Sequence, residues 1–269
     1  MAAPAVIFLA GLFVLPVGQF LLGSLFDPAF TLKHYERLAE SRAFLVVIEN
    51  TVRISATVTL ASLLLGYPVA FRITTFNPRL AALTLLALVL SVWISLLVRN
   101  YAWMVLLGRE GLLSAGLLRF GLIDQKQSFL YNEFAVILAM THVLLPFMVI
   151  PIVAAMRSID PSLIRAAEGM GARPLAVLRR VVFPLSLPGA ATGCVLVFIL
   201  ALGFFVTPAI IGGRGQIMVA MLIEGEVNEQ LNWGYAAAYA TTLLVLTLAI
   251  FAVFHRRFGM QRLWGGATK

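Results

Sequence analysis

Residues able to do catalytic chemistry are few and widely separated in this sequence. The three histidines, His34, His142 and His255, lack the H-E-x-x-H spacing of a zinc site, and the chain has a single cysteine, Cys194. No buried serine or aspartate stands at helical spacing from a base, and no G-x-x-x-x-G-K-[ST] sequence is present to hold a nucleotide phosphate. We therefore expect no catalytic residue, no metal site and no cofactor in this chain.

A second set of polar and aromatic residues lies inside long apolar stretches. Strongly polar side chains are expensive at membrane depth, roughly 2.5–3.5 kcal/mol for an arginine at a helix centre, so they tend to face a cavity. Arg53 and Arg99 lie near the ends of such stretches and are interpreted as snorkelling to the interface. The other polar and aromatic groups recur at helical spacing or beside a helix break, and they predict a solute path lined by Trp93, Asn100, Tyr101, Phe204 and Phe205.

The composition is that of an integral membrane protein. Of the 269 residues, 61% are hydrophobic and only 12% are charged, whereas a soluble domain carries roughly 25% charged residues. A membrane-spanning helix needs about 20 mostly apolar residues. The sequence predicts an all-α protein with six spans, at approximately 4–26, 50–71, 80–104, 133–156, 187–211 and 235–254.

The charges decide the expected orientation. The connections 72–79 and 157–186 and the tail 255–269 together hold eleven basic and two acidic residues, whereas the remaining charges are nine basic and ten acidic. Positive charge between spans collects on the cytoplasmic side. We therefore expect both termini in the cytoplasm, and we read the net charge of +8 as a consequence of topology and not of nucleic-acid binding.

The connection 157–186 contains a structured island between the fourth and fifth spans. Asp160-Pro161 is a strong helix start, because aspartate caps well and proline at the first position has no amide hydrogen to leave unpaired. That helix is expected to run through Met170, with glycines available for a left-handed turn. Arg173-Pro174 then starts a second short helix, which Pro184 is expected to interrupt.

The first helix of this island has a face of small residues, formed by Ala166, Ala167, Gly169 and Gly171. Arg165 and Glu168 stand three residues apart, so they can pair along the helix for a few tenths of a kcal/mol. Such a helix can seat in a groove of a partner protein. The alternative is an ordinary cytoplasmic loop that only satisfies the charge rule.

The order A-A-x-x-x-G, nine residues, V-x-F-P in 166–184 resembles the EAA loop of permease subunits of binding-protein-dependent ABC importers. Residues 142–189, together with L-G-Y-P-V-A-F at 65–71 and S-L-L-V-R-N-Y at 95–101, resemble the spermidine/putrescine branch. One position departs from the family pattern. Glutamate is usual where this chain has Arg165, and a basic residue is frequent where it has Glu168, so the order of charges is reversed.

The resemblance implies a type I ABC importer permease fold over residues 1–269, in a multi-pass protein of the bacterial inner membrane. It implies that the chain forms half of a solute path, for a polyamine or a related small organic solute. The expected partners are a related but non-identical second permease, two ATP-binding subunits that hold ATP and Mg, and an extracytoplasmic solute-binding protein. The residues implied in coupling to the ATPase are Arg165, Ala166, Ala167, Glu168, Gly169, Met170 and Gly171.

Two other questions stay open at the level of sequence. An ion-coupled secondary transporter or channel subunit, independent of ATP, would also explain six spans, but it would not explain a docking helix between two of them. The acidic residues near the outer membrane face could form an entry vestibule or dock the binding protein; they are Glu49, Glu133, Glu224, Glu226 and Glu229.

Overall fold

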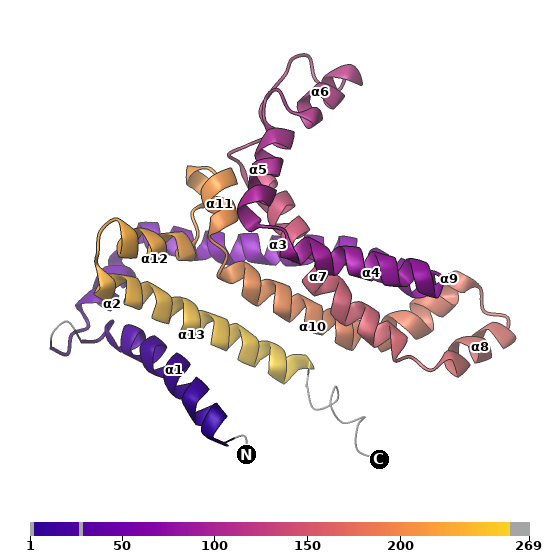
Figure 1. Cartoon of the computed structure of the whole chain (residues 1–269), viewed down its shortest axis with the longest axis horizontal. Helices are drawn as coiled ribbons and strands as arrows, with labels where there is room; N and C mark the ends of the chain where they lie inside the picture. The colour runs from indigo at the N-terminus through magenta and orange to yellow at the C-terminus, as the bar shows by residue number, and fades with distance from the viewer. Residues whose placement is uncertain (1–2, 27–28, 259–269) are drawn as a thin grey trace.

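The computed structural model describes residues 3–26 and 29–258, and this part of the chain is helical with no extended strand. Figure 1 shows an elongated bundle in which α8 lies at one end and α2 and α12 lie at the other. The final residues 259–269, which hold part of the basic tail counted above, lie outside the described residues. The all-α fold predicted from the apolar stretches is confirmed.

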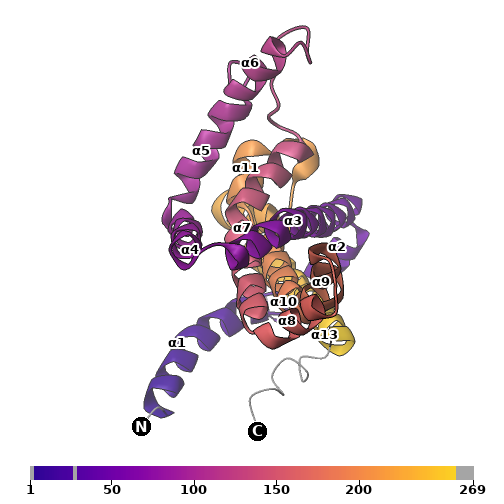
Figure 2. The same cartoon turned by 90° about the vertical axis from the view of Figure 1, so that its right-hand side faces the viewer.

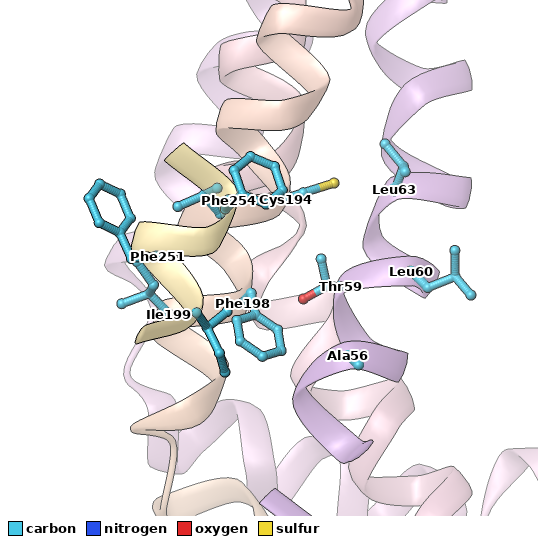
Figure 3. Close-up of a pocket in the computed structure, with 11 residues that line it drawn as sticks. Ala56, Thr59, Leu60, Leu63, Cys194, Phe198, Ile199, Phe251 and Phe254 are labelled. Atoms are coloured by element: carbon cyan, nitrogen blue, oxygen red, sulfur yellow. The ribbon is translucent and has the colours of Figure 1, made fainter. Parts of the chain in front are cut away.

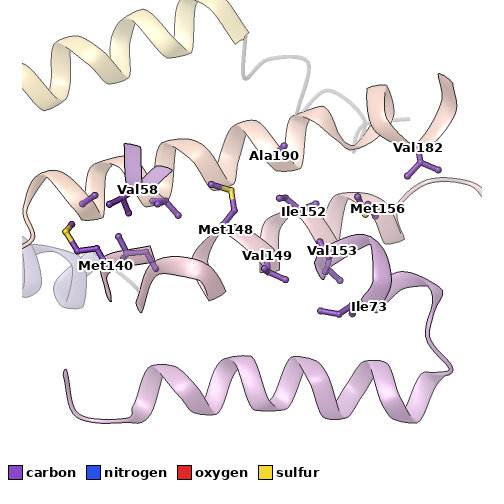
Figure 4. Close-up of a cluster of buried hydrophobic side chains, with 14 of the residues drawn as sticks. Val58, Ile73, Met140, Met148, Val149, Ile152, Val153, Met156, Val182 and Ala190 are labelled. Atoms are coloured by element: carbon purple, nitrogen blue, oxygen red, sulfur yellow. The ribbon is translucent and has the colours of Figure 1, made fainter. Parts of the chain in front are cut away.

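Three long helices form the core: α3 (Arg42–Thr75), α7 (Glu133–Arg157) and α10 (Phe183–Leu202). Two of these helices begin with an N-cap: the Ser41 side chain accepts a hydrogen bond from Phe44 N, and the Asn132 side chain accepts one from Ala135 N. Figure 4 shows buried side chains that these helices share, with Val58 and Ile73 from α3, Met148 and Ile152 from α7, and Ala190 from α10. In the most apolar stretch of α7, 61% of the residues are buried, compared with 17% in the corresponding stretch of α13 (Trp233–Phe258). Helix α7 is therefore central in the bundle and α13 is peripheral.

Close approach in this core depends on glycine. A Cβ on Gly189 of α10 would lie 2.4 Å from Ala155 Cβ and 2.6 Å from the carbonyl oxygen of Pro151, both on α7. One on Gly193 would lie 2.8 Å from the Met148 sulfur. The two helices therefore touch along a strip where no larger residue fits.

At the end opposite α8, four helices close the bundle: α1 (Ala3–Leu22), α2 (Lys33–Glu40), α12 (Val219–Asn228) and α13. Their cluster is aromatic, with the Tyr235 and Tyr239 rings 4.7 Å apart and Phe44 of α3 packed 5.0 Å from Tyr239. The Arg37 guanidinium lies 4.9 Å above the Tyr235 ring, a cation–π contact that joins α2 to α13.

The third predicted span, 80–104, is not one helix. The chain forms α4 (Pro78–Trp93) and α5 (Leu96–Leu107), with a break between them (Figure 2). The direction of the chain changes there by 98°, measured between Pro78–Trp93 and the stretch Leu96–Arg119. The short helix α6 (Leu112–Arg119) follows α5 and projects from the bundle (Figure 1).

The fifth predicted span, 187–211, also ends early. Helix α10 stops at Leu202, and a separate short helix, α11 (Val206–Ile211), follows. Within the described residues, four helices are long and apolar enough to cross a membrane, or five if α4 and its bent continuation count as one; α1 adds a shorter apolar stretch, Ala10–Leu22. The six-span count and the orientation of the termini stay predictions.

Candidate coupling loop and solute path

The island between α7 and α10 begins as its sequence predicts. Helix α8 (Pro161–Gly169) has Pro161 at its first position, and the carboxylate of Asp160 accepts a hydrogen bond from Ser162 N at 2.8 Å. Hydrogen bonds from the backbone and the side chain of Ser162 hold the pKa of Asp160 below its usual value. The predicted cap is confirmed.

The end of α8 is a Schellman turn. Gly171 has φ +81°, its N–H donates to Glu168 O at 2.9 Å, and Ala172 N donates to Ala167 O at 3.1 Å. The glycine corner is therefore confirmed, although the helix ends at Gly169, one residue earlier than predicted.

The small-residue face of α8 is divided between two environments. Ala167 is only 8% exposed and packs against the core, whereas Arg165, Ala166, Glu168 and the glycines on either side of Met170 are exposed. Both charged side chains are described, and no ion pair within 4 Å joins Arg165 to Glu168. Only part of the face is therefore free to meet another protein.

Exposed apolar side chains are a further feature of this loop, and of these only Met170 was singled out from the sequence. Met170 is 83% exposed, Leu175 74% and Leu163 48%. Leu163 and Leu175 could have been found from the sequence, because they are apolar residues that belong neither to the small-residue face nor to the charged pair. These side chains form the apolar surface of the loop, which we call the coupling knobs: Leu163, Met170 and Leu175.

Pro184 does not interrupt the second helix of the loop, contrary to the prediction. Helix α9 (Pro174–Val177) continues through a π-helical turn, η1 (Leu178–Val182), directly into α10, so residues 174–202 are one rod. Phe183 N–H donates to Leu178 O, five residues back. In an α-helix the ring of Pro184 would clash with the carbonyl four residues earlier, and the wider turn accommodates this ring without ending the helix.

The predicted solute-path residues are in part brought together. Asn100 on α5 is fully buried, and its Oδ1 accepts a 3.0 Å hydrogen bond from the hydroxyl of Thr207 on α11. Phe204 is half-buried and Phe205 is 37% exposed, and both lie in the break just before α11. Thr207 was missed, because nothing in its local sequence separates it from an ordinary helical threonine.

Trp93 and Tyr101 lie apart from this contact. Trp93 is 83% exposed at the last position of α4, and Tyr101 is 61% exposed on α5. In the described chain they face outward, where lipid or another subunit can cover them. The prediction that these two residues line a path therefore requires a second subunit to enclose them.

The two arginines interpreted as snorkelling behave differently from each other. Arg99 is buried, with 7% exposure, and its guanidinium donates to the carbonyl oxygens of Ser91 and Ile94 at the end of α4, so this interpretation was wrong for Arg99. Arg53 is exposed; it pairs with Glu133 at 3.1 Å and donates to Asn50 Oδ1 at 3.1 Å. Arg53 thus ties α3 to the first turn of α7.

Figure 3 shows an apolar pocket of about 310 Å³ between α3, α10 and α13, lined by residues that include Thr59, Cys194, Phe198 and Phe254. Its walls suit hydrocarbon and not a charged solute. Among the described residues, no group of three or more histidine, cysteine, aspartate or glutamate side chains could hold a metal ion.

Comparison with known proteins gives the same kind of molecule throughout. A sequence profile described as "binding-protein-dependent transport system inner membrane component" matches residues 62–263. The spermidine/putrescine transport system permease protein PotB of Haemophilus influenzae is 33% identical over 226 residues, covering 84% of this chain and 79% of that protein. Its Escherichia coli counterpart is 31% identical over 227 residues, covering 84% and 82%.

The fold is shared with a solved transporter. A chain in the crystal structure of a bacterial alginate ABC transporter, in complex with an alginate pentasaccharide-bound periplasmic protein, superposes with a TM-score of 0.80. The superposition covers 97% of this chain and 92% of that one, at 19% sequence identity. At this identity the likeness concerns the fold alone.

Proposed function

This chain belongs to the family of binding-protein-dependent transport system inner membrane components and is a multi-pass permease subunit of an ABC importer, and we propose that it imports polyamines. It is a transporter subunit and not an enzyme. The observation that carries the substrate proposal is the 33% identity to a spermidine/putrescine permease over most of both chains. The charges and rings of the described residues support it in two places.

The outer end of the bundle offers carboxylates to an arriving cation. The side chain of Glu133 is 32% exposed at the first turn of α7, and its present partner is the guanidinium of Arg53. Glu226 of α12 is buried, and burial raises its pKa while the nearby Arg37 lowers it. An organic ammonium group can take the place of an arginine at such sites, because both are cations that hydrogen-bond to carboxylate oxygens.

Deeper in the chain, the aromatic groups at the start of α11 suit the same solute. Phe204 and Phe205 directly precede α11, three and two residues before the Thr207 that bonds to Asn100, and a ring face attracts an ammonium group within about 6 Å of its centre. We propose that these four residues line the part of the path that this chain supplies, with Trp93 and Tyr101 contributing where a second permease meets α4 and α5.

Energy for transport comes from another chain in this proposal. The sequence has no phosphate-binding loop of the G-x-x-x-x-G-K-[ST] type, so ATP and Mg belong to two separate ATP-binding subunits. We propose that α8 and the coupling knobs seat in a groove of one such subunit on the cytoplasmic face, while a solute-binding protein docks outside. Both termini are then cytoplasmic. An ion-coupled carrier would have no use for this exposed apolar loop.

Copurification tests the coupling role. Met170→Glu places a charge on the most exposed of the coupling knobs, and it should abolish copurification of the ATP-binding subunit with the permease. Leu112→Glu is the matched control, because Leu112 is 75% exposed on α6 at a distance from the loop, and it should leave copurification intact. Equal binding of the ATPase by both variants would refute the docking role of α8.

Uptake tests the substrate. Labelled spermidine should accumulate in vesicles that contain the complete complex, and unlabelled putrescine should compete with it. Failure of spermidine uptake by a complex that retains its ATPase would reject the polyamine while leaving the coupling role standing.

A further inference from the structure

The junction between the coupling loop and the membrane bundle contains a joint with three parts. The first is the π-helical turn η1, where Phe183 N–H bonds to Leu178 O and the proline that follows offers no N–H. A π-helical turn holds one more residue than an α-helical turn. Its hydrogen bonds are fewer per residue and less favourable than those of an α-helix. It is therefore the place in the rod 174–202 that deforms most easily.

The second part is a fixed anchor beyond the turn. Gly189 and Gly193 bring α10 into direct contact with α7, at separations that leave no room for a methyl group. Gly189 lies seven residues after Val182, which is about 10 Å along an α-helix. Figure 4 shows Val182 at the turn and, farther along α10, Ala190, which follows Gly189 in the chain. Because of this contact, movement of the loop cannot slide α10 along α7. The movement either deforms the π-turn or is transmitted to the bundle through the contacts of the first turn of α10.

The third part is a polar contact from α3 that holds this first turn. The hydroxyl of Tyr67 lies 2.7 Å from Ser186 Oγ, and Ser186 is fully buried. Ser186 gives its one proton to Phe183 O at 3.0 Å, so the Tyr67 hydroxyl is the donor to Ser186. The Tyr67 ring also meets the Phe183 ring edge-on, with centroids 5.6 Å apart. Helix α3 thus contacts α10 at Phe183, the residue whose N–H closes the π-turn.

We propose that Tyr67 and Ser186 are positioning residues that make the π-turn transmit force. The inference rests on the proposed coupling role of α8. With the contact intact, displacement of α8 and α9 turns α3, α7 and α10 as one body. Without it, the same displacement unwinds the first turn of α10 and is lost before it reaches the solute path. The residues touch neither solute nor nucleotide.

The experiment uses the complete complex in proteoliposomes. Its first measurement is the stimulation of ATP hydrolysis by the solute-binding protein, which requires a signal to cross this junction and does not depend on the identity of the solute. We expect Tyr67→Phe and Ser186→Ala each to lower that stimulation about fivefold, the equivalent of the net free energy of one hydrogen bond. Ser186→Ala already removes the bond to Tyr67 together with its own bond to Phe183 O, so the double variant should lose no more than Ser186→Ala alone.

The chain supplies a matched control at its other end. The hydroxyl of Tyr35 lies 2.7 Å from Ser24 Oγ, and Ser24, in the turn that follows α1, donates to Leu21 O three residues back. This pair repeats the hydroxyl chemistry of the first pair far from the coupling loop. Tyr35→Phe should lower the melting temperature to a similar extent as Tyr67→Phe and leave the stimulation unchanged.

Three results would overturn the proposal: unchanged stimulation in both Tyr67→Phe and Ser186→Ala, an equal loss in Tyr35→Phe, or additive losses in the double variant. If one of the two single variants assembles poorly, the other decides. A failure of the docking role is distinguished by a different result, namely that Met170→Glu still copurifies with the ATPase. The Tyr67 and Ser186 variants are expected to retain the ATPase whether or not the joint transmits force.

Discussion

The contact between α7 and α10 gives the sharpest prediction about stability. Gly189→Ala adds one methyl group at a point where the new Cβ would lie 2.4 Å from Ala155 Cβ and 2.6 Å from Pro151 O. Carbon atoms pack best at about 3.5–4.0 Å, so the helices are about 1 Å too close for the new group. The backbone carbonyl of Pro151 cannot rotate away as a flexible side chain would.

The expected cost follows from this geometry. An extra methylene in a well-packed core typically costs 1–3 kcal/mol, and a rigid backbone neighbour places Gly189→Ala toward the upper part of that range, at about 2 kcal/mol net of the better helix propensity of alanine. For a chain of this size, that corresponds to a fall in melting temperature of roughly 5 °C. Ala155→Gly in the same chain removes one of the two close contacts and should restore part of the loss.

Thermal unfolding of the purified permease in detergent measures the effect. Gly225→Ala is the control, because no atom lies within 4 Å of a Cβ added there and the position is inside α12, so its melting temperature should stay equal or rise. A melting temperature unchanged by Gly189→Ala would refute the packing of α7 on α10 described above. A full loss in the double variant with Ala155→Gly would show that only the Pro151 carbonyl matters.

Three further predictions concern charge. The exchange Arg165→Glu with Glu168→Arg should leave ATP-driven uptake nearly intact, because both side chains are exposed and unpaired with each other; loss of uptake at normal expression would contradict this. The cap by Asp160 should hold at neutral pH and fail as the pH falls through the lowered pKa of Asp160, since only the ionised carboxylate gives its full stabilisation to the helix start. Amide exchange at Ser162, compared between wild type and Asp160→Asn, measures the difference. Glu133→Gln breaks the half-exposed pair with Arg53 and should cost less than about 1 kcal/mol in thermal unfolding, so a larger loss would mean that the pair is buried in the assembly.

The sequence predicts best where the structure depends on neighbouring residues. The cap at Asp160, the proline at the first position of α8 and the left-handed Gly171 are local devices, and all are found as expected. Long apolar runs likewise predict the cores of α3 and α7, although α3 begins at Arg42 and not near residue 50. The reason is that Ser41 caps a helix whose first turns pack outside the apolar run.

The sequence predicts poorly where distant residues decide. Nothing between Pro78 and Leu107 marks a break, because the stretch contains neither an internal proline nor a glycine. The bend exists because Arg99 reaches back to the carbonyl oxygens that α4 leaves free. The π-turn before Pro184 is a similar case, since proline alone predicts an end to the helix, whereas packing of α10 on α7 and the Tyr67 contact favour continuation.

The two breaks in the apolar helices meet at one contact, and this contact supports the proposed place of the solute path. Backbone groups freed at membrane depth need partners, so irregular segments persist there only when buried in protein or lining a water-filled cavity. Arg99 supplies partners for the end of α4, where the negative end of a helix dipole also favours a cation. One residue later, Asn100 bonds to Thr207, which lies in the first turn after the other break. Two interrupted helices joined by a buried amide–hydroxyl contact are costly unless they shape a polar passage. This cost is the physical reason for our proposal that the solute passes near Asn100 and not through the apolar pocket between α3, α10 and α13.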